Sequence, residues 1–115
     1  MNQKTELDPA CCPTPELELD LRPVEGAAAD EELALLAKAV AHPARVRILR
    51  LLSRKEARVC SQIVGELPLA QSTVSEHLRI LKEAGLIRSR EEGSRVGYCI
   101  NFPVLRRFKA LAAIL

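Results

Sequence analysis

The chain has few aromatic residues and lacks the marks of membrane or secreted proteins. Its 115 residues include one tyrosine, two phenylalanines and no tryptophan, so aliphatic side chains must build the core. A core of this kind favours helices packed on helices. No apolar run reaches the roughly 18 residues of a membrane span, and no signal peptide opens the chain. We therefore expect a cytoplasmic protein with no membrane segment.

Catalytic motifs are missing as well. No phosphate-binding loop is visible, and no nucleophile is paired with a base. The two histidines, His42 beside a proline and His77 in a polar stretch, offer little for catalysis. The sequence therefore argues against an enzyme.

Charge is divided unevenly along the chain. Residues 1–32 carry two basic and nine acidic side chains, a sum of −7, whereas residues 33–115 carry fifteen basic and six acidic ones, a sum of +9. A basic domain of this size suggests a polyanionic partner, most often duplex DNA. We divide the chain into a flexible, proline-containing acidic arm at 1–30 and a folded domain at 31–115. In the arm, Leu17, Leu19 and Leu21 alternate with acidic residues, which suits a short strand or a docking strip.

Apolar spacing predicts three helices before residue 68. The first begins at Asp30 as its N-cap and ends before Pro43, because the residue before a proline avoids helical geometry. The second spans 43–53, and the third is a short helix over 61–67. The residues expected to face inward on the first two are Leu33, Leu36, Ala37, Val40, Val46, Leu49 and Leu52.

The most informative stretch is 69–87, with sequence LAQSTVSEHLRILKEAGLI. Val74, Leu78 and Leu81 recur at spacings of four and three, which predicts an amphipathic helix that Gly85 ends. Its opposite face carries polar side chains suited to reading base edges. These are Gln71, Ser72, Thr73, Ser75, Glu76 and His77. With the short helix before it, this stretch forms a helix-turn-helix.

After Gly85 the apolar residues change from helical spacing to alternation, which predicts a β-hairpin. Residues 86–90 and 95–101 alternate and are joined by a turn containing Gly93. A last helix over 103–115 has an apolar face too broad for a lone helix in water. The predicted fold is therefore mainly α with a small β-hairpin, a winged helix-turn-helix that pairs as a homodimer through its terminal helices.

Three stretches together resemble the ArsR/SmtB family of metal-sensing repressors: AHPARVRILRLL, QSTVSEHLRILKEAGLI and GSRVGYCI. The resemblance runs from about residue 33 to 108. It implies a dimeric repressor that occupies an imperfect inverted repeat of double-stranded operator DNA and leaves it when an ion binds. One departure is Ala70, where the family often has a capping serine; losing the cap costs on the order of 1 kcal/mol of helix stability.

The polar face of the 69–87 helix and the hairpin supply the candidate DNA contacts. Glutamine can bridge adenine, serine and threonine can bond bases or phosphates, and glutamate can accept from cytosine. Arginines further along would touch phosphate or the minor groove. The predicted contacts are Gln71, Ser72, Thr73, Ser75, Glu76, His77, Arg79, Arg88, Arg90 and Arg95.

The cysteines indicate what the repressor senses. Cys60 occupies the second cysteine position of the family's ELCVCDL-type motif, and Arg58 stands at the first. Adjacent Cys11 and Cys12 in the arm can supply two more thiolates. Three sulfur ligands suit As(III), or Sb(III), better than zinc, which normally takes four. The arm and Cys60 together resemble the arsenic-responsive branch with an N-terminal cysteine pair, and the resemblance implies that the pair reaches Cys60 of the other subunit. Cys99 is interpreted as a bystander.

The resemblance implies that zinc sensors of this family use His and carboxylate ligands on the last helix. Residues 103–115 contain no His, Asp or Glu, so no structural zinc is expected. Three other readings remain open. A disulfide between the arm and Cys60 would make a redox switch. A Cd- or Pb-responsive repressor would use Cys99 or a non-thiol ligand as a fourth donor. In a protein-interaction module, the arm's leucines would dock a partner and the cysteines would be incidental.

Overall fold

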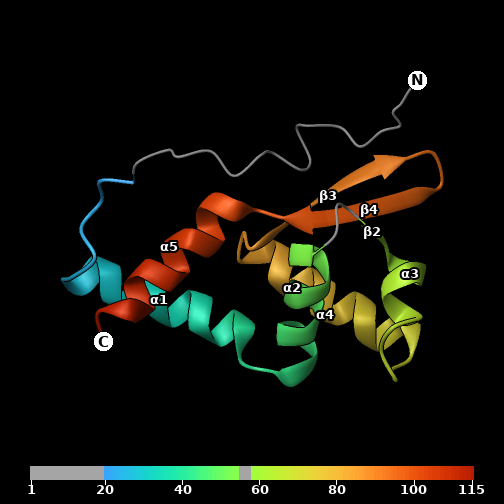
Figure 1. The fold of residues 1–115 in the computed structure, drawn as a ribbon, viewed down its shortest axis with the longest axis horizontal. Coiled ribbons are helices and arrows are strands. Elements are labelled where there is room, and N and C mark those ends of the chain that lie inside the picture. The colour runs from blue at the N-terminus through green and yellow to red at the C-terminus, as the bar shows by residue number, and fades with distance from the viewer. Residues whose placement is uncertain (1–19, 55–57) are drawn as a thin grey trace.

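The structure is a computed structural model, and it describes residues 20–54 and 58–115. Within these ranges the chain forms five helices and three short strands. In chain order they are α1 (Ala27–Val40), α2 (Pro43–Arg54), β2 (Arg58–Val59), α3 (Cys60–Val64), α4 (Gln71–Glu83), β3 (Ile87–Glu92), β4 (Arg95–Ile100) and α5 (Phe102–Ala113). A helix-turn-helix followed by a hairpin confirms the predicted winged helix-turn-helix (Figure 1).

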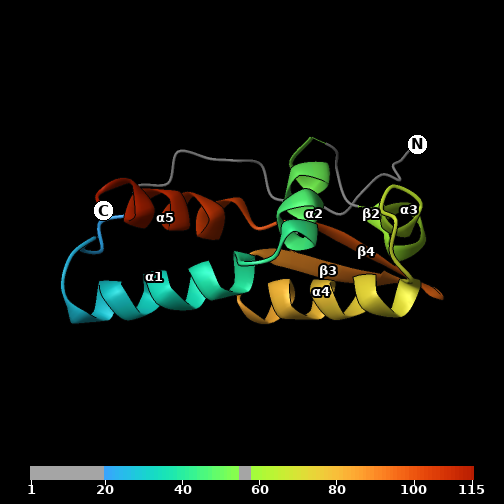
Figure 2. The same ribbon diagram turned by 90° about the horizontal axis from the view of Figure 1, so that it is seen from below.

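The molecule has two halves, which Figure 2 separates clearly. Helices α1 and α4 lie nearly end to end along one side, with α5 beside α1 and the hairpin beside α4. We call α1, α5 and residues 20–26 the platform half, and α3, α4 and the hairpin the reading half. Ile48 and Leu52 of α2 lie fully buried in the core that joins the two halves.

The sheet is antiparallel in the order β2-β4-β3. The hairpin pairs Ile87 with Ile100 at its base and residue 92 with Arg95 at its tip, and Gly93 takes a φ of 65° in the turn. The two-residue strand β2 was not predicted. It pairs with residues 97 and 98 of β4, so the chain just before α3 is tied to the wing.

Several predicted boundaries shift in the structure. Helix α1 begins at Ala27 rather than after Asp30, because Gly26, with a φ of 109°, starts the helix and its carbonyl accepts the Asp30 N–H at 2.9 Å. Alanine is also a strong helix former. Ala37, predicted inside, is exposed. Helix α3 is displaced and shorter than predicted, and Cys60 is its first residue.

The buried side of α4 is as predicted. Val74, Leu78 and Leu81 are each at most 1% exposed, and Gly85 follows the helix with a φ of 86°. A left-handed residue at this position is a common way to end a helix. No helix in the described part of the chain is long and apolar enough to cross a membrane.

Candidate nucleic-acid interface

The exposed side of α4 presents a row of polar side chains. Six of the residues predicted to contact DNA are at the surface there: Gln71, Ser72, Thr73, Ser75, Glu76 and Arg79. They lie opposite the buried row of Val74, Leu78 and Leu81. The helix can therefore offer short hydrogen-bonding groups to a major groove, and their contact with DNA stays a prediction.

His77 is not on this exposed face, and the expectation that it faces DNA is wrong. It is 8% exposed, and its ring contacts that of His42 at a tilt of 47°, with 4.4 Å between ring centroids. The reason is helical spacing, since residue 77 lies three residues after Val74 and four before Leu81. Burial, followed by the electrostatic effects of His42 and Arg45, lowers the pKa of His77. The imidazole therefore stays neutral at pH 7, with a buried Nδ1 that has no protein partner among the described residues.

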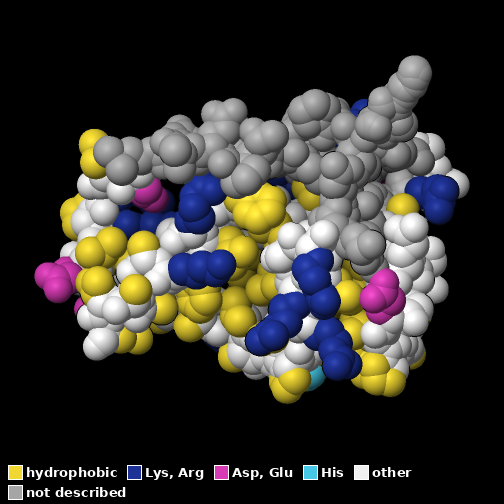
Figure 3. Space-filling view, viewed as in Figure 1, with side chains coloured by type: hydrophobic (Ala, Val, Ile, Leu, Met, Phe, Trp, Pro, Cys, Tyr) yellow, Lys and Arg dark blue, Asp and Glu magenta, His cyan; other side chains and the backbone are white. Residues whose placement is uncertain are grey.

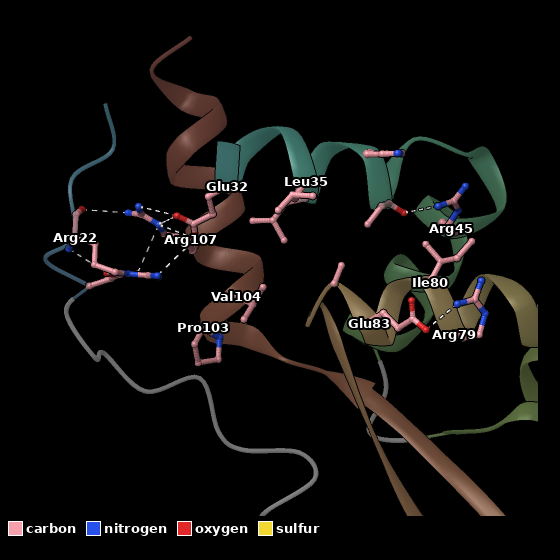
Figure 4. Close-up of a pocket in the computed structure, with 15 residues that line it drawn as sticks. Arg22, Glu32, Leu35, Arg45, Arg79, Ile80, Glu83, Pro103, Val104 and Arg107 are labelled. Carbon is pink, nitrogen blue, oxygen red and sulfur yellow. Dashed lines mark hydrogen bonds and ion pairs between the residues drawn. The ribbon is translucent and has the colours of Figure 1, made fainter. Parts of the chain in front are cut away.

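Glu76 faces outward but is not left alone. Arg79 donates from Nε to Glu76 Oε1 at 3.0 Å and from Nη1 to Glu83 Oε2 at 2.7 Å (Figure 4 shows the second pair). These hydrogen bonds lower the pKa of Glu76 and raise that of Arg79. Arg79 thus compensates a carboxylate that would otherwise repel DNA phosphates.

The hairpin brings its three candidate arginines to one face. Arg88 and Arg90 are two residues apart on β3, and Arg95 of β4 stands opposite residue 92. Side chains on a strand alternate, and paired residues of neighbouring strands share a face. The register therefore places Arg88, Arg90 and Arg95 on the same side of the wing, where basic groups suit a DNA backbone.

Cys60, the predicted sensor cysteine, lies against α4, the helix predicted to read DNA. It is half-buried at the start of α3, and its Sγ is 3.6 Å from the Ser75 Oγ of α4. Burial, followed by the electrostatic effect of Cys60, raises the pKa of Tyr98 in β4. Cys60 therefore contacts α4, and β2 ties the residues just before it to the wing.

The other predicted sulfur ligands, Cys11 and Cys12, lie outside the described residues. Within residues 20–54 and 58–115, no group of three or more His, Cys, Asp or Glu is placed to hold a metal ion. Cys99, interpreted as a bystander, is 2% exposed and stands opposite Arg88 in the hairpin register. A three-thiolate site thus depends on the arm.

A polar network in the platform half was missed by sequence reasoning. Arg107 of α5 has a side chain only 4% exposed and binds both carboxylate oxygens of Glu32 at 3.0 to 3.2 Å. It also donates to the backbone carbonyl of Arg22 at 3.1 Å (Figure 4) and to that of Pro23 at 2.7 Å. The base of the arm is thereby fastened to α1 and α5.

Two signals could have revealed these buried polar groups. His77 falls on the inward positions of α4, and Arg107 falls three residues after Val104 and four before Leu111 on the apolar face of α5. In both cases the helical spacing of the apolar residues predicts a buried position, whereas the polar residue type suggests the surface. The Cys60–Ser75 contact could not be found this way, because it joins two helices.

A family model described as "Bacterial regulatory protein, arsR family" matches residues 42–89. That range begins just before α2 and includes all of α3 and α4.

Individual proteins agree with the family model. The transcriptional repressor PagR of Bacillus anthracis is 41% identical over 64% of this chain and 73% of its own length. A solved structure described as a possible transcriptional regulator for arsenical resistance is 30% identical, with a TM-score of 0.63, and is matched over 69% of this chain and 80% of that one. A homodimeric winged helix-turn-helix DNA-binding domain from Mycobacterium bovis, a possible ArsR-family regulator, is 30% identical, with a TM-score of 0.64 over 84% of this chain and 89% of that one.

Proposed function

The chain belongs to the arsR family of bacterial regulatory proteins, and we propose that it is an arsenite-responsive transcriptional repressor acting in the cytoplasm. Its relatives and structural neighbours are DNA-binding regulators, not enzymes. In this proposal the repressor binds operator DNA and releases it when As(III), or Sb(III), is held by the thiolates of Cys11, Cys12 and Cys60.

The DNA-bound form is a homodimer. Large apolar side chains are left exposed on the platform half, where Leu35 of α1 is 69% exposed and Leu115, just beyond α5, is 94% exposed. Next to them, α1, α4 and α5 line a groove of about 870 Å³ (Figure 4). A second copy covering this side would present two α4 helices to an imperfect inverted repeat, with half-sites about 34–36 Å apart. The homodimeric neighbour from Mycobacterium bovis supports this assembly.

The observation that carries the sensing proposal is the contact between Cys60 and Ser75. A ligand at Cys60 would bind the sulfur atom that lies 3.6 Å from the Ser75 hydroxyl of α4. Soft three-coordinate As(III) fits a donor set made only of thiolates. The arm must supply two of them, since the described residues offer no further ligand group around Cys60.

Release requires that the ion bind the DNA-free conformation more tightly than the DNA-bound one. Ser75 sits among the predicted base contacts, so withdrawing Cys60 from it changes how the start of α4 is held. Because β2 joins Cys60 to β4, a shift of α3 also reaches the wing. Both DNA-contacting elements thus respond to one sulfur atom.

The test is release of a labelled operator fragment by arsenite. The wild-type protein should release DNA, and Cys11→Ser, Cys12→Ser and Cys60→Ser should each need far more arsenite or fail to respond. Cys99→Ser is the matched control and should respond as the wild type does. If Cys60→Ser releases DNA at the wild-type arsenite concentration, the proposed site is wrong.

The same assay separates the rival sensors. Release by peroxide, reversed by a reductant and independent of arsenite, would indicate a redox switch. Release by cadmium or lead with loss in Cys99→Ser would indicate a four-ligand site.

A further inference from the structure

A second groove lies between α2 and α5, away from the DNA-reading face of α4. It measures about 600 Å³ and is lined by residues of the two helices alone. The lining residues are Val46, Leu49, Arg50, Ser53, Arg54, Leu105 and Lys109. The floor is aliphatic and the rim is cationic, so the groove combines an apolar surface with positive charge.

No acidic side chain is among the described residues that line this groove. Figure 3 shows the wider setting: dark-blue side chains gather over α2 and α5 on this face of the molecule. An occupant with alternating apolar and acidic residues would match both features at once, because leucines could cover the floor while carboxylates meet the rim.

The chain contains such a segment in its own arm. Residues 16–19 read Glu-Leu-Glu-Leu and continue into Asp20 and Leu21. Residues 16–19 lie outside the described ranges, so their match to the groove is one of sequence alone. In an extended chain, the side chains of Leu17 and Leu19 point to one side and those of Glu16 and Glu18 to the other. A strip of this kind can place its leucines downward and keep both carboxylates within reach of flanking arginines.

The point from which the arm starts is fixed by the structure. Arg107 holds the carbonyls of Arg22 and Pro23, and Asp20 pairs with Arg22 at 2.7 Å. Asp20 and Arg22 border another depression on α5, also of about 600 Å³, that includes Lys109. Lys109 in turn lines the α2–α5 groove. The described chain therefore stops at one end of a continuous path across α5 toward α2.

We propose that residues 16–19 of the arm dock in the α2–α5 groove of their own subunit. Leu17 and Leu19 cover the floor formed by Val46, Leu49 and Leu105. Glu16 and Glu18 meet the cations of the rim. Four extended residues span about 13 Å.

The docked direction has a consequence for sensing, which rests on the proposed function. Moving from Asp20 toward Arg54, the arm approaches the end of α2, only six residues before Cys60 in the chain. Cys11 and Cys12 are a further four to five residues along the arm, beyond this end of the groove. Docking and sensing remain separable, since the arm can dock without any ion.

Zero-length carbodiimide cross-linking of the full-length protein, without arsenite, tests the docking. The reagent joins a lysine to a carboxylate in contact with it, and Lys109 is the one lysine among the described lining residues. We expect cross-links from Lys109 to Glu16 or Glu18, identified by mass spectrometry, to exceed those from Lys38 and Lys82, which lie on α1 and α4. In a Leu17→Ser/Leu19→Ser variant, the cross-links from Lys109 should fall about tenfold.

A matched pair of variants on α2 tests the charge of the rim. Arg50→Gln/Arg54→Gln should reduce the Lys109 cross-link, whereas Arg47→Gln, exposed on the same helix but outside the groove, should not. Equal cross-linking of Lys38, Lys82 and Lys109, or no response to the leucine variant, would overturn the proposal. So would cross-links that join heavy-nitrogen-labelled to unlabelled subunits in mixed dimers, because they would assign the groove to the partner's arm.

The docking proposal and the arsenite-site proposal can fail independently. If the cross-link is found but Cys60→Ser still releases DNA with arsenite, docking stands and the arsenite site is wrong. If arsenite release depends on Cys11, Cys12 and Cys60 but Lys109 shows no preferred cross-link, the arm reaches Cys60 by another route and the docking proposal is wrong.

Discussion

The platform half and the reading half are held by different kinds of polar contact. In the platform half, buried Arg107 bonds to Glu32, Arg22 and Pro23, which are 75, 85 and 84 residues away in sequence. In the reading half, Arg79 is half-exposed and bonds to carboxylates three and four residues away on its own helix. The hydroxyl of Ser75 adds one contact across to α3. An arginine makes the main polar contacts in each half, but of the two only Arg107 joins segments that are distant in sequence.

This difference bears on how a switch can work in so small a protein. Regions held by few buried long-range contacts open or shift at lower cost than regions held by many. In the proposed function, the platform half keeps the dimer and the base of the arm in place, and the reading half moves relative to DNA. Both halves have buried apolar side chains, but the long-range ion pair lies in the platform half. In that proposal, a ligand at Cys60 would bias α4 without breaking the Arg107 network.

The largest predicted effect is at Arg107. Arg107→Met removes the donor to two backbone carbonyls and the bidentate partner of Glu32, which is partly exposed and keeps Arg22 Nη1 at 3.6 Å. Leaving such groups without a hydrogen bond costs about 2 to 3 kcal/mol. We expect the free energy of unfolding in urea to fall by that amount. Arg47→Met, which removes a charge from an exposed position of α2, is the control and should change little. Equal losses of unfolding free energy for the two variants would show that the Arg107 network contributes no more to stability than an exposed charge does.

A smaller effect is expected at His77, on the buried side of the reading helix. Its pKa is lowered from 6.5, so between that lowered value and pH 6.5 the unfolded chain binds more protons than the folded one. Stability should therefore fall as the pH drops below 6.5 and level off beneath the folded pKa. Burial is the largest cause of the lowering; among the described residues, His42 and Arg45 add to it and Glu76 opposes it.

The variant His77→Leu tests that argument. It removes a buried nitrogen that has no partner, and we expect it to stabilise the fold by between about 1 and 2 kcal/mol at pH 7. Melting temperatures measured from pH 7.5 to 5 should decline less steeply than those of the wild type. Parallel curves for the two proteins would show that another group is responsible for the acid sensitivity.

His77 and Arg107 also show where sequence reasoning reached its limit. The period of apolar residues was enough to predict α4, its buried side and the hairpin, because those features depend on local spacing. The same period marked positions 77 and 107 as inward, but a polar residue is buried only if the fold supplies neighbours for it. His42 and Glu32, the neighbours in question, come from other elements.

The elements that escaped prediction are non-local for the same reason. Strand β2 has two residues and exists through its pairing with Gly97 and Tyr98. The contact of Cys60 with Ser75 depends on how α3 crosses α4. The roles predicted for Cys11, Cys12 and the DNA-facing residues of α4 remain predictions, since they concern residues or partners outside the described structure.

The cap of α4 offers a modest gain in stability. Ala70 occupies the N-cap with extended backbone angles, φ −68° and ψ 155°, and makes no side-chain cap hydrogen bond. Ala70→Ser should stabilise the fold by about 1 kcal/mol, measured by urea unfolding. A gain in Ala70→Gly as large as in Ala70→Ser would show that the hydroxyl is not the cause.

The smallest effect on stability is expected at Arg79, and it completes the comparison of the two arginines. Exposed ion pairs on one helix contribute little to folding, so Arg79→Gln should shift the melting temperature less than any variant above.

The effect of Arg79→Gln should appear on DNA affinity instead, because Glu76 would then face the phosphates without a compensating cation. Lys82→Gln, on the same helix, removes equal charge without touching Glu76 and is the control. Operator affinity should fall further in Arg79→Gln than in Lys82→Gln at every salt concentration. If the two variants bind alike, Arg79 acts only as a charge. If Arg79→Gln unfolds as readily as Arg107→Met, the reading half is held as firmly as the platform half, and the proposed division of the molecule is wrong.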